Sequence, residues 1–158
     1  MTVLIQGSQL RALLLGVRVY KDPVDTANGT TDLFTITGGR VAVTSILGRV
    51  TTAFGATPAN AKLVYDPTAA GNSFDLCTAV AVASDAIGQT YTIAGDVETV
   101  GALLVAGEVG QANAVFAKPL VLAAGTIELN LSADPGVGAS DWTLTYIPLD
   151  DGSSVAAA

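Results

Sequence analysis

The stretch GTIELNLSA, residues 125–133, alternates strictly between apolar and polar side chains. Its apolar members and its polar members occupy opposite sides of an extended chain: Ile127, Leu129 and Leu131 against Glu128, Asn130 and Ser132. A period of two residues is the pattern of a strand that has one side in a core and the other in water. The stretch therefore predicts a half-buried β-strand.

Similar short runs, rich in Val, Ile, Thr and aromatic residues, recur along the chain between Gly, Pro, Asn and Asp. Such spacing is typical of an all-β sandwich or barrel, and helical periodicity is nearly missing. We expect a single jelly-roll-like β-sandwich of about eight to ten strands. The predicted strands cover residues 11–20, 32–37, 40–54, 61–65, 74–84, 89–94, 112–123, 125–133 and 142–147.

Four features of this pattern carry more specific expectations. Gly48, inside residues 40–54, predicts a bulge or a bend where the strand passes from one sheet to the other. Residues 74–84 are apolar or small on both sides, which predicts cover by a second sheet or by a neighbouring subunit. Lys118 and Pro119 interrupt an apolar run, which predicts that this run lies on an edge strand or at a bulge. Residues 96–107 predict one short helix, with a strand pair as the alternative.

The ends of the chain differ in composition from its middle. Residues 1–16 are expected to form an N-terminal arm or an extra strand, and residues 17–152 the β-sandwich domain. Pro148 should stop the pairing of the last strand, and the adjacent Asp150 and Asp151 should be solvated. Residues 153–158 are small and of low complexity, so we expect a flexible C-terminal tail.

Charged residues are scarce in this chain of 158 residues. They make up 13% of it, against about 25% in typical soluble domains, while 50% of the residues are hydrophobic. We infer that part of the apolar surface is buried against other chains, the alternative being a bland surface of Ala, Gly and Thr. The net charge of −7 disfavours nucleic acid and an anionic membrane surface as partners.

Residue types that carry chemistry are also scarce. The chain has no histidine and one cysteine, Cys77, which we interpret as a small buried apolar residue. Asp22, Asp25 and Asn28 do not have the spacing of a calcium loop. We therefore predict no catalytic, cofactor-binding or metal-binding residues, no cofactor, and a protein that is not an enzyme.

Aromatic and basic side chains are the remaining candidates for binding. Trp142 shares one side of its strand with Leu144 and Tyr146, which favours a place in the core or a subunit interface. The alternative is a sugar-stacking role together with the loop of residues 66–72. The cations Arg40, Arg49, Lys62 and Lys118 are scattered, so they can form ion pairs but no basic patch.

Four stretches, in this order, carry a family resemblance: DLFTITGGRVAVTSILGRVTTAF (32–54), FDLCTAVAV (74–82), KPLVLAAGTIELNLSA (118–133) and WTLTYIPLDDGSSV (142–155). Together they resemble a family of small structural proteins of tailed bacteriophages. The resemblance spans residues 31–155, and its most specific features are TGGRV at residues 37–41 and YIPLDDG at residues 146–152. Residues 1–16 look additional to the family pattern.

The resemblance implies a structural virion protein, namely a capsid decoration or cement protein. Such a protein is made in the host cytoplasm, binds the lattice of the major capsid protein on the outer capsid surface, and is commonly a homotrimer. Two alternatives stay open. One is a structural role in a head fibre, collar or tail, and the other is a carbohydrate-binding module for host attachment.

Overall fold

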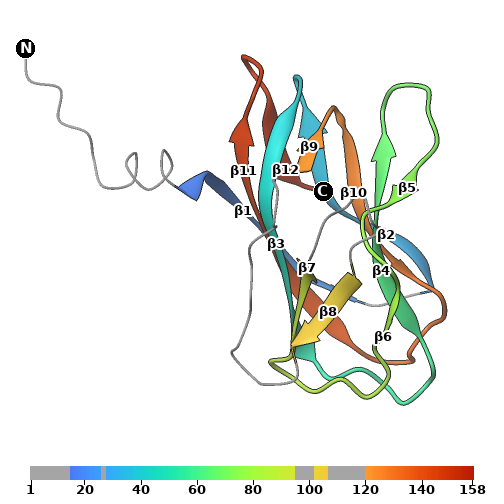
Figure 1. The fold of residues 1–158 in the computed structure, drawn as a ribbon. Coiled ribbons are helices and arrows are strands. Elements are labelled where there is room, and N and C mark those ends of the chain that lie inside the picture. The colour runs from blue at the N-terminus through green and yellow to red at the C-terminus, as the bar shows by residue number, and fades with distance from the viewer. Residues whose placement is uncertain (1–14, 26–27, 95–101, 107–119) are drawn as a thin grey trace, which may run out of the picture.

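The computed structural model describes residues 15–25, 28–94, 102–106 and 120–158. Its strands form two antiparallel sheets that pack face to face, so the expected β-sandwich is confirmed (Figure 1). The described residues hold twelve strands, more than the expected eight to ten. Two of the additional strands lie in segments that we predicted to be a helix and a tail.

Sheet A has the strand order β1-β11-β3-β7-β8, and the short strand β9 also pairs with β3. Its strands are β1 (Val17–Asp25), β3 (Val41–Thr52), β7 (Thr90–Ala94), β8 (Ala102–Ala106), β9 (Leu120–Leu122) and β11 (Ala139–Pro148).

Sheet B has the strand order β12-β2-β10-β4-β5, and β6 pairs with β4. Its strands are β2 (Gly29–Thr37), β4 (Asn60–Pro67), β5 (Phe74–Asp75), β6 (Val80–Ala81), β10 (Gly125–Leu131) and β12 (Ser154–Ala157).

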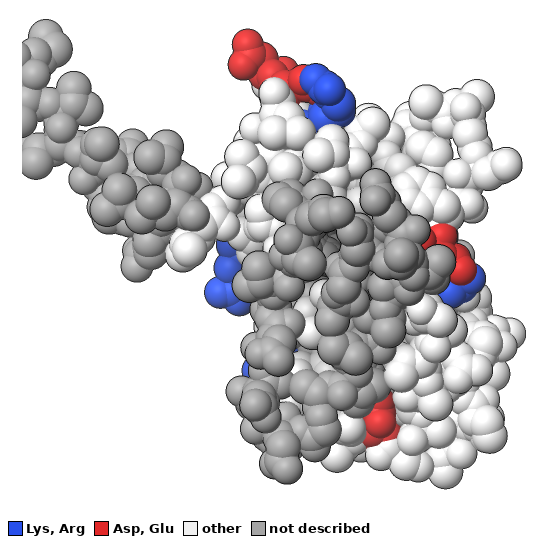
Figure 2. Space-filling view, in the orientation of Figure 1, with Lys and Arg blue, Asp and Glu red and all other residues white. Residues whose placement is uncertain are grey.

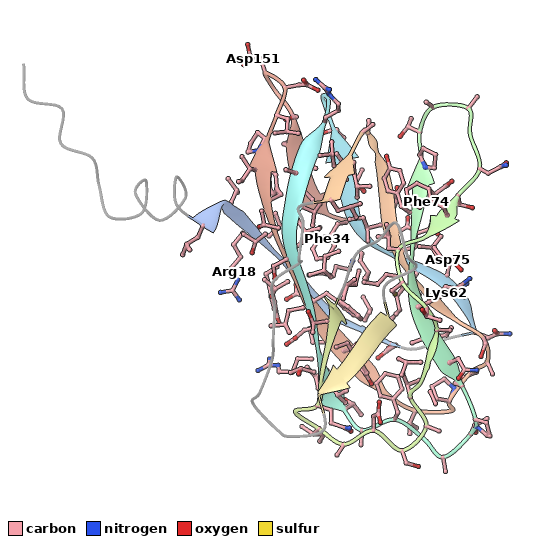
Figure 3. All side chains as sticks on the ribbon, in the orientation of Figure 1. Arg18, Phe34, Lys62, Phe74, Asp75 and Asp151 are labelled. Carbon is pink, nitrogen blue, oxygen red and sulfur yellow. The ribbon has the colours of Figure 1, made fainter. Side chains whose placement is uncertain are left out.

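Strand β10 is the central strand of sheet B and follows the predicted alternation. Ile127, Leu129 and Leu131 are buried, whereas Glu128 and Asn130 are partly exposed. It pairs along its length with β2 on one side and β4 on the other. Because each strand turns its apolar side inward, the core lies between the sheets, where Phe34 is labelled in Figure 3.

The prediction of a bulge or a bend at Gly48 is wrong, because β3 runs through this position within sheet A and pairs there with β11 in regular register. The pairing of β3 with β11 shifts register at two other places, around Thr44 and Thr51. Gly48 faces Trp142 instead, and a β-carbon there would lie 2.7 Å from the indole ring. The glycine therefore makes room for a large side chain on the neighbouring strand.

Residues 74–84 do not form the single two-sided strand that we expected. They form β5 and β6, each of two residues, and both pair with β4. Between them the adjacent Leu76 and Cys77 are both fully buried, whereas Phe74 and most of the other residues of the segment are exposed. The apolar character of this segment thus serves the core of the same chain.

The prediction of a helix over residues 96–107 is also wrong for the part of this segment that the structure describes. Residues 102–106 form β8, which pairs with β7 from Thr90↔Ala106 to Ala94↔Ala102. The described part of the segment is therefore a strand, and the rest of the segment lies outside the described residues. Gly101 and the β-branched residues of the segment disfavour a helix, whereas β7 offers an edge with which a strand can pair.

The C-terminal residues do not leave the domain as the expected tail. Ser154–Ala157 form β12, which pairs antiparallel with β2, and Val155 is buried. The Ala158 amide donates a hydrogen bond to the Leu33 carbonyl at 3.1 Å. The unpaired edge of β2 explains why small residues with little strand propensity become ordered.

Several predictions fall wholly or partly outside the described residues. They concern residues 1–14 of the arm expected over residues 1–16, the first residues of the strands expected at 11–20 and 112–123, and the edge or bulge at Lys118 and Pro119. The described part of the first of these strands begins at Val17 and that of the second at Leu120.

Candidate functional site and interaction surfaces

The outward side of sheet A, which we call face A, carries an ordered set of polar side chains. On β11 the buried Trp142 and Leu144 point inward, so Asp141 and Thr143 point outward. The pairing register places Asp141 opposite Arg49 of β3, and Tyr20 of β1 opposite Thr143. Three strands that are distant in sequence thus contribute to one group.

Asp141 is the centre of this group. Its side chain is only 6% exposed, whereas that of Arg49 is 56% exposed. The Arg49 guanidinium donates from Nε at 3.2 Å and from Nη2 to Asp141 Oδ2, and the Tyr20 hydroxyl donates to the same oxygen at 3.1 Å. The bonds to Asp141 raise the pKa of Arg49. The carboxylate is therefore held by two neighbours, and one of them is a cation that still faces solvent.

A hollow of about 180 Å³ lies beside this group on face A. It is lined by Arg18, Tyr20, Leu47, Arg49, Asp141 and Thr143. Arg18 makes one long hydrogen bond, from Nη2 to Thr143 Oγ1 at 3.5 Å. Two guanidinium groups therefore border the hollow, which we call the arginine hollow.

An apolar row lies further along face A, toward the β2–β3 turn. The register places Val121 of β9 and Ile147 of β11 on either side of Ala42 of β3. Val121 is 54% exposed and Ile147 is 43% exposed, and Leu149, just past the end of β11, is also exposed. We call Val121, Ala42 and Ile147 the apolar row.

The outward side of sheet B, face B, is acidic. Glu128 of β10 lies opposite Asp32 of β2. Thr126, two residues earlier on β10 and on the same side of it, lies opposite Asp66 of β4. Partial burial raises the pKa of Glu128, and the charges of Asp32 and Asp66 raise it further. Lys62 is a cation on this face, and its ammonium lies 2.7 Å from Asp75.

The two faces therefore differ in charge. In Figure 3 Arg18 projects from one side of the sandwich, and Lys62 and Asp75 project from the other. Charged groups are few on the described surface that Figure 2 shows, and red and blue side chains touch there in two places. Of the cations that we expected to be scattered, Arg40, Arg49 and Lys62 each bind a carboxylate within the chain. Lys118 lies outside the described residues.

The motifs TGGRV and YIPLDDG, which carry the family resemblance, contact each other. The Arg40 amide donates to Asp150 Oδ2 at 2.7 Å, and its guanidinium binds both carboxylate oxygens at 3.0 and 2.8 Å. A β-carbon at Gly38, which has a φ of +75°, would collide with the Gly152 carbonyl. The two turns thus form one structural unit, and only the exposed Asp151 is solvated as expected.

Trp142 is part of the core, as we favoured. It is 1% exposed, stacks on Tyr91 with 6.2 Å between ring centroids, and donates from Nε1 to Ser140 Oγ at 3.0 Å. It cannot stack on a sugar, because no ring face reaches solvent. The loop of residues 66–72 is exposed for most of its length, but the aromatic residue beside it is Phe74.

Cys77 is fully buried, as expected, and burial raises the pKa of its thiol to about 11. Asp22 and Asp25 lie on β1, and no three His, Cys, Asp or Glu side chains of the described residues gather as metal ligands would. No described helix has the length and apolar character that crossing a membrane would require.

Comparison with protein-family models, curated proteins and solved structures finds no match.

Sequence reasoning did not find the arginine hollow. Arg18 and Arg49 occur in two predicted strands and Asp141 directly precedes a third, but their meeting depends on β1 and β3 flanking β11. One local signal was present: Asp141 and Thr143 alternate with the apolar residues of β11, so both had to share its outward side. The strand order was needed to supply their partners.

Proposed function

We propose that this chain is a non-enzymatic structural protein of a phage particle, a capsid decoration or cement protein. In this proposal it binds the lattice of the major capsid protein on the outside of the virion and stabilises the head. The family resemblance of residues 31–155 suggests the particle, and the difference between the two sandwich faces suggests the mode of binding.

The observation that carries the proposal is the asymmetry between face A and face B. Face A combines exposed apolar side chains, Val121 and Ile147, with two arginines around a hollow. Face B carries Asp32, Glu128 and Asp66, which favour contact with water. A decoration protein needs one face that docks and another that stays in solvent, and the contrast between face A and face B supports this arrangement.

Repeated weak contacts suit such a role. A capsid presents many equivalent sites, and an oligomer that binds several of them gains avidity although each contact is modest. We propose a homotrimer for this reason. Docking through face A leaves the strand edges of the sandwich available for contacts between copies.

A head fibre, collar or tail protein with the same fold is the structural alternative. Immunogold labelling of intact particles separates the two, because label over the head supports decoration and label at the neck or tail supports the alternative. The carbohydrate-binding alternative loses its main candidate contact, because Trp142 is buried in the core.

The first test is the mass of the purified chain by light scattering, followed by co-sedimentation with heads of the parent phage that lack it. We expect a trimer that pellets with heads at a saturable stoichiometry. A monomer that stays in the supernatant at all head concentrations would refute the proposal. Bovine serum albumin is a suitable negative control, because it reports non-specific trapping.

A further inference from the structure

We propose that the arginine hollow binds a carboxylate side chain of an acidic partner protein, which under the proposed function is the capsid protein. Five of its six lining residues are polar or charged, and they come from β1, β3 and β11. The inference rests on the proposed function for the partner's identity, but the chemistry of the hollow can be tested without capsids.

The two arginines of the hollow have more hydrogen-bond donors than their contacts within the chain use. Each guanidinium carries five N–H donors in a planar fork. Arg49 directs Nε and Nη2 at Asp141, and Arg18 makes one long contact to Thr143, so both keep donors for a ligand. A second carboxylate can therefore receive bonds from two forks without displacing Asp141.

The charge of the hollow favours an anion. Two guanidinium groups border it, Asp141 offsets one of them, and Asp22, whose charge helps to raise the pKa of Tyr20, lies outside the lining. This positive site persists on a chain whose net charge is −7. A hollow of about 180 Å³ has room for the end of an Asp or Glu side chain.

A protein is a better source of this carboxylate than a free anion. The apolar row lies on the same face, and Ile147 is four residues along β11 from Thr143, a distance of roughly 13 Å. A protein surface can cover the row and fill the hollow together, whereas a small anion can do only the second. An acidic partner is also repelled by Asp32, Asp66 and Glu128 of face B, so the charges select one orientation.

The capsid arm of the test compares two variants that each remove one positive charge. Arg18→Gln changes the hollow, and Lys62→Gln changes face B, so the second is a matched control. In co-sedimentation at low salt we expect Arg18→Gln to raise the Kd about tenfold and Lys62→Gln to change it less than about twofold. Equal effects of both variants, or no effect of Arg18→Gln, would overturn the inference and leave the decoration role in place.

The peptide arm uses the full chain labelled with ¹⁵N and follows the arginine Nε–H signals by NMR. The probes are a blocked hexaglutamate peptide, its hexaglutamine counterpart, and sodium acetate at the same carboxylate concentration. We expect hexaglutamate to shift the Arg18 and Arg49 signals, and neither the glutamine peptide nor acetate to match it. Shifts with hexaglutamate but no binding to heads would support the hollow and refute the proposed partner. No shift with hexaglutamate, or an equal shift with acetate, would overturn the inference.

Discussion

Gly48 and Trp142 show how one residue accommodates another across two strands. The two positions are paired in the β3–β11 register, and a β-carbon at Gly48 would lie 2.7 to 2.9 Å from three atoms of the indole ring. We expect Gly48→Ala to lower the free energy of unfolding by about 1–3 kcal/mol, because a rigid buried ring cannot move aside without strain. Urea denaturation followed by Trp142 fluorescence measures this change.

Gly71→Ala is the matched control for Gly48→Ala. A β-carbon at Gly71 would first meet Pro67 Cγ at 3.5 Å, which is an ordinary contact. The added methyl reduces the freedom of the unfolded chain, so stability should stay equal or rise by up to about 1 kcal/mol. If both alanine variants have the same stability, the indole is not the reason for glycine at position 48.

The effect of pH on the stability of the fold should be clearest at Asp150. Hydrogen bonds from the Arg40 side chain and amide lower the pKa of Asp150 to about 2. Since this folded pKa lies below that of an unfolded aspartate, near 4, the stabilisation is present above about pH 4. It is lost as the pH falls toward 2. The stability difference between the wild type and Asp150→Asn should therefore shrink over this interval.

Carbon-13 NMR of the side-chain carboxylates measures the Asp150 pKa directly. We expect Arg40→Gln to return it toward about 4. Lys62→Gln removes a cation elsewhere and should leave it near 2. A wild-type Asp150 that titrates near 4 would show that the two turns are not held together by this ion pair.

Single residues were predicted well where their role depends on nearby sequence. The core position of Trp142 followed from its alternation with Leu144 and Tyr146, and the burial of Cys77 from the general tendency of a free cysteine to be buried. The bond between Asp141 and Arg49 could not be predicted, because it joins residues 92 positions apart. Only the register of β3 on β11 brings them together.

Strand β12 is the element that differs most from expectation. The residues SVAA have weak strand propensity, yet they pair with β2 and bury Val155. We expect Val155→Ala to cost about 1–3 kcal/mol of stability, because two buried methyl groups are removed. A flexible tail would give no change. Thermal and urea denaturation, monitored by circular dichroism, distinguish these outcomes.

Val121→Ala makes the same substitution at a side chain that is 54% exposed. It should alter stability by less than about 0.5 kcal/mol, since most of the valine already contacts water. Equal losses in the two variants would mean that the Val155 effect reflects strand propensity and not burial. Equal stability of Val155→Ala and the wild type would contradict the pairing of β12.

The elements that were predicted correctly have strong local patterns, and those that were missed depend on a partner. Strand β10 alternates cleanly, and β3 is a long β-branched run, so both were found from sequence. Strands β8 and β12 each pair with one neighbouring strand, β7 and β2 respectively. Strand propensity is a weak guide at such positions, because the available edge decides the structure.

At the scale of the molecule, the sandwich architecture followed from sequence but the strand order did not. Sheet A places β11, from near the end of the described chain, between β1 and β3, which both come from its first third. These long-range pairings create face A. The difference between an arginine-bearing face and an acidic face is therefore a property of the topology, and no single stretch of sequence contains it.

Face A should make two contributions to particle binding that salt can separate. The arginine hollow acts through charge and should weaken as ionic strength rises, whereas the apolar row acts through burial and should not. We expect Ile147→Ser to raise the Kd for heads by about tenfold or more, by nearly the same factor at low and high salt. Co-sedimentation across a salt series measures both variants, since the loss caused by Arg18→Gln should diminish at high salt.

Val137→Ser is the control for Ile147→Ser, because Val137 is 61% exposed and lies outside the apolar row, in the β10–β11 connection. If it weakens binding as much as Ile147→Ser, general surface hydrophobicity and not face A drives the association. If Ile147→Ser is without effect while Arg18→Gln is not, a polar contact alone holds the protein to the shell. A salt-independent loss confined to Ile147→Ser requires that the partner covers the apolar row, and so fixes which face of the sandwich meets the capsid.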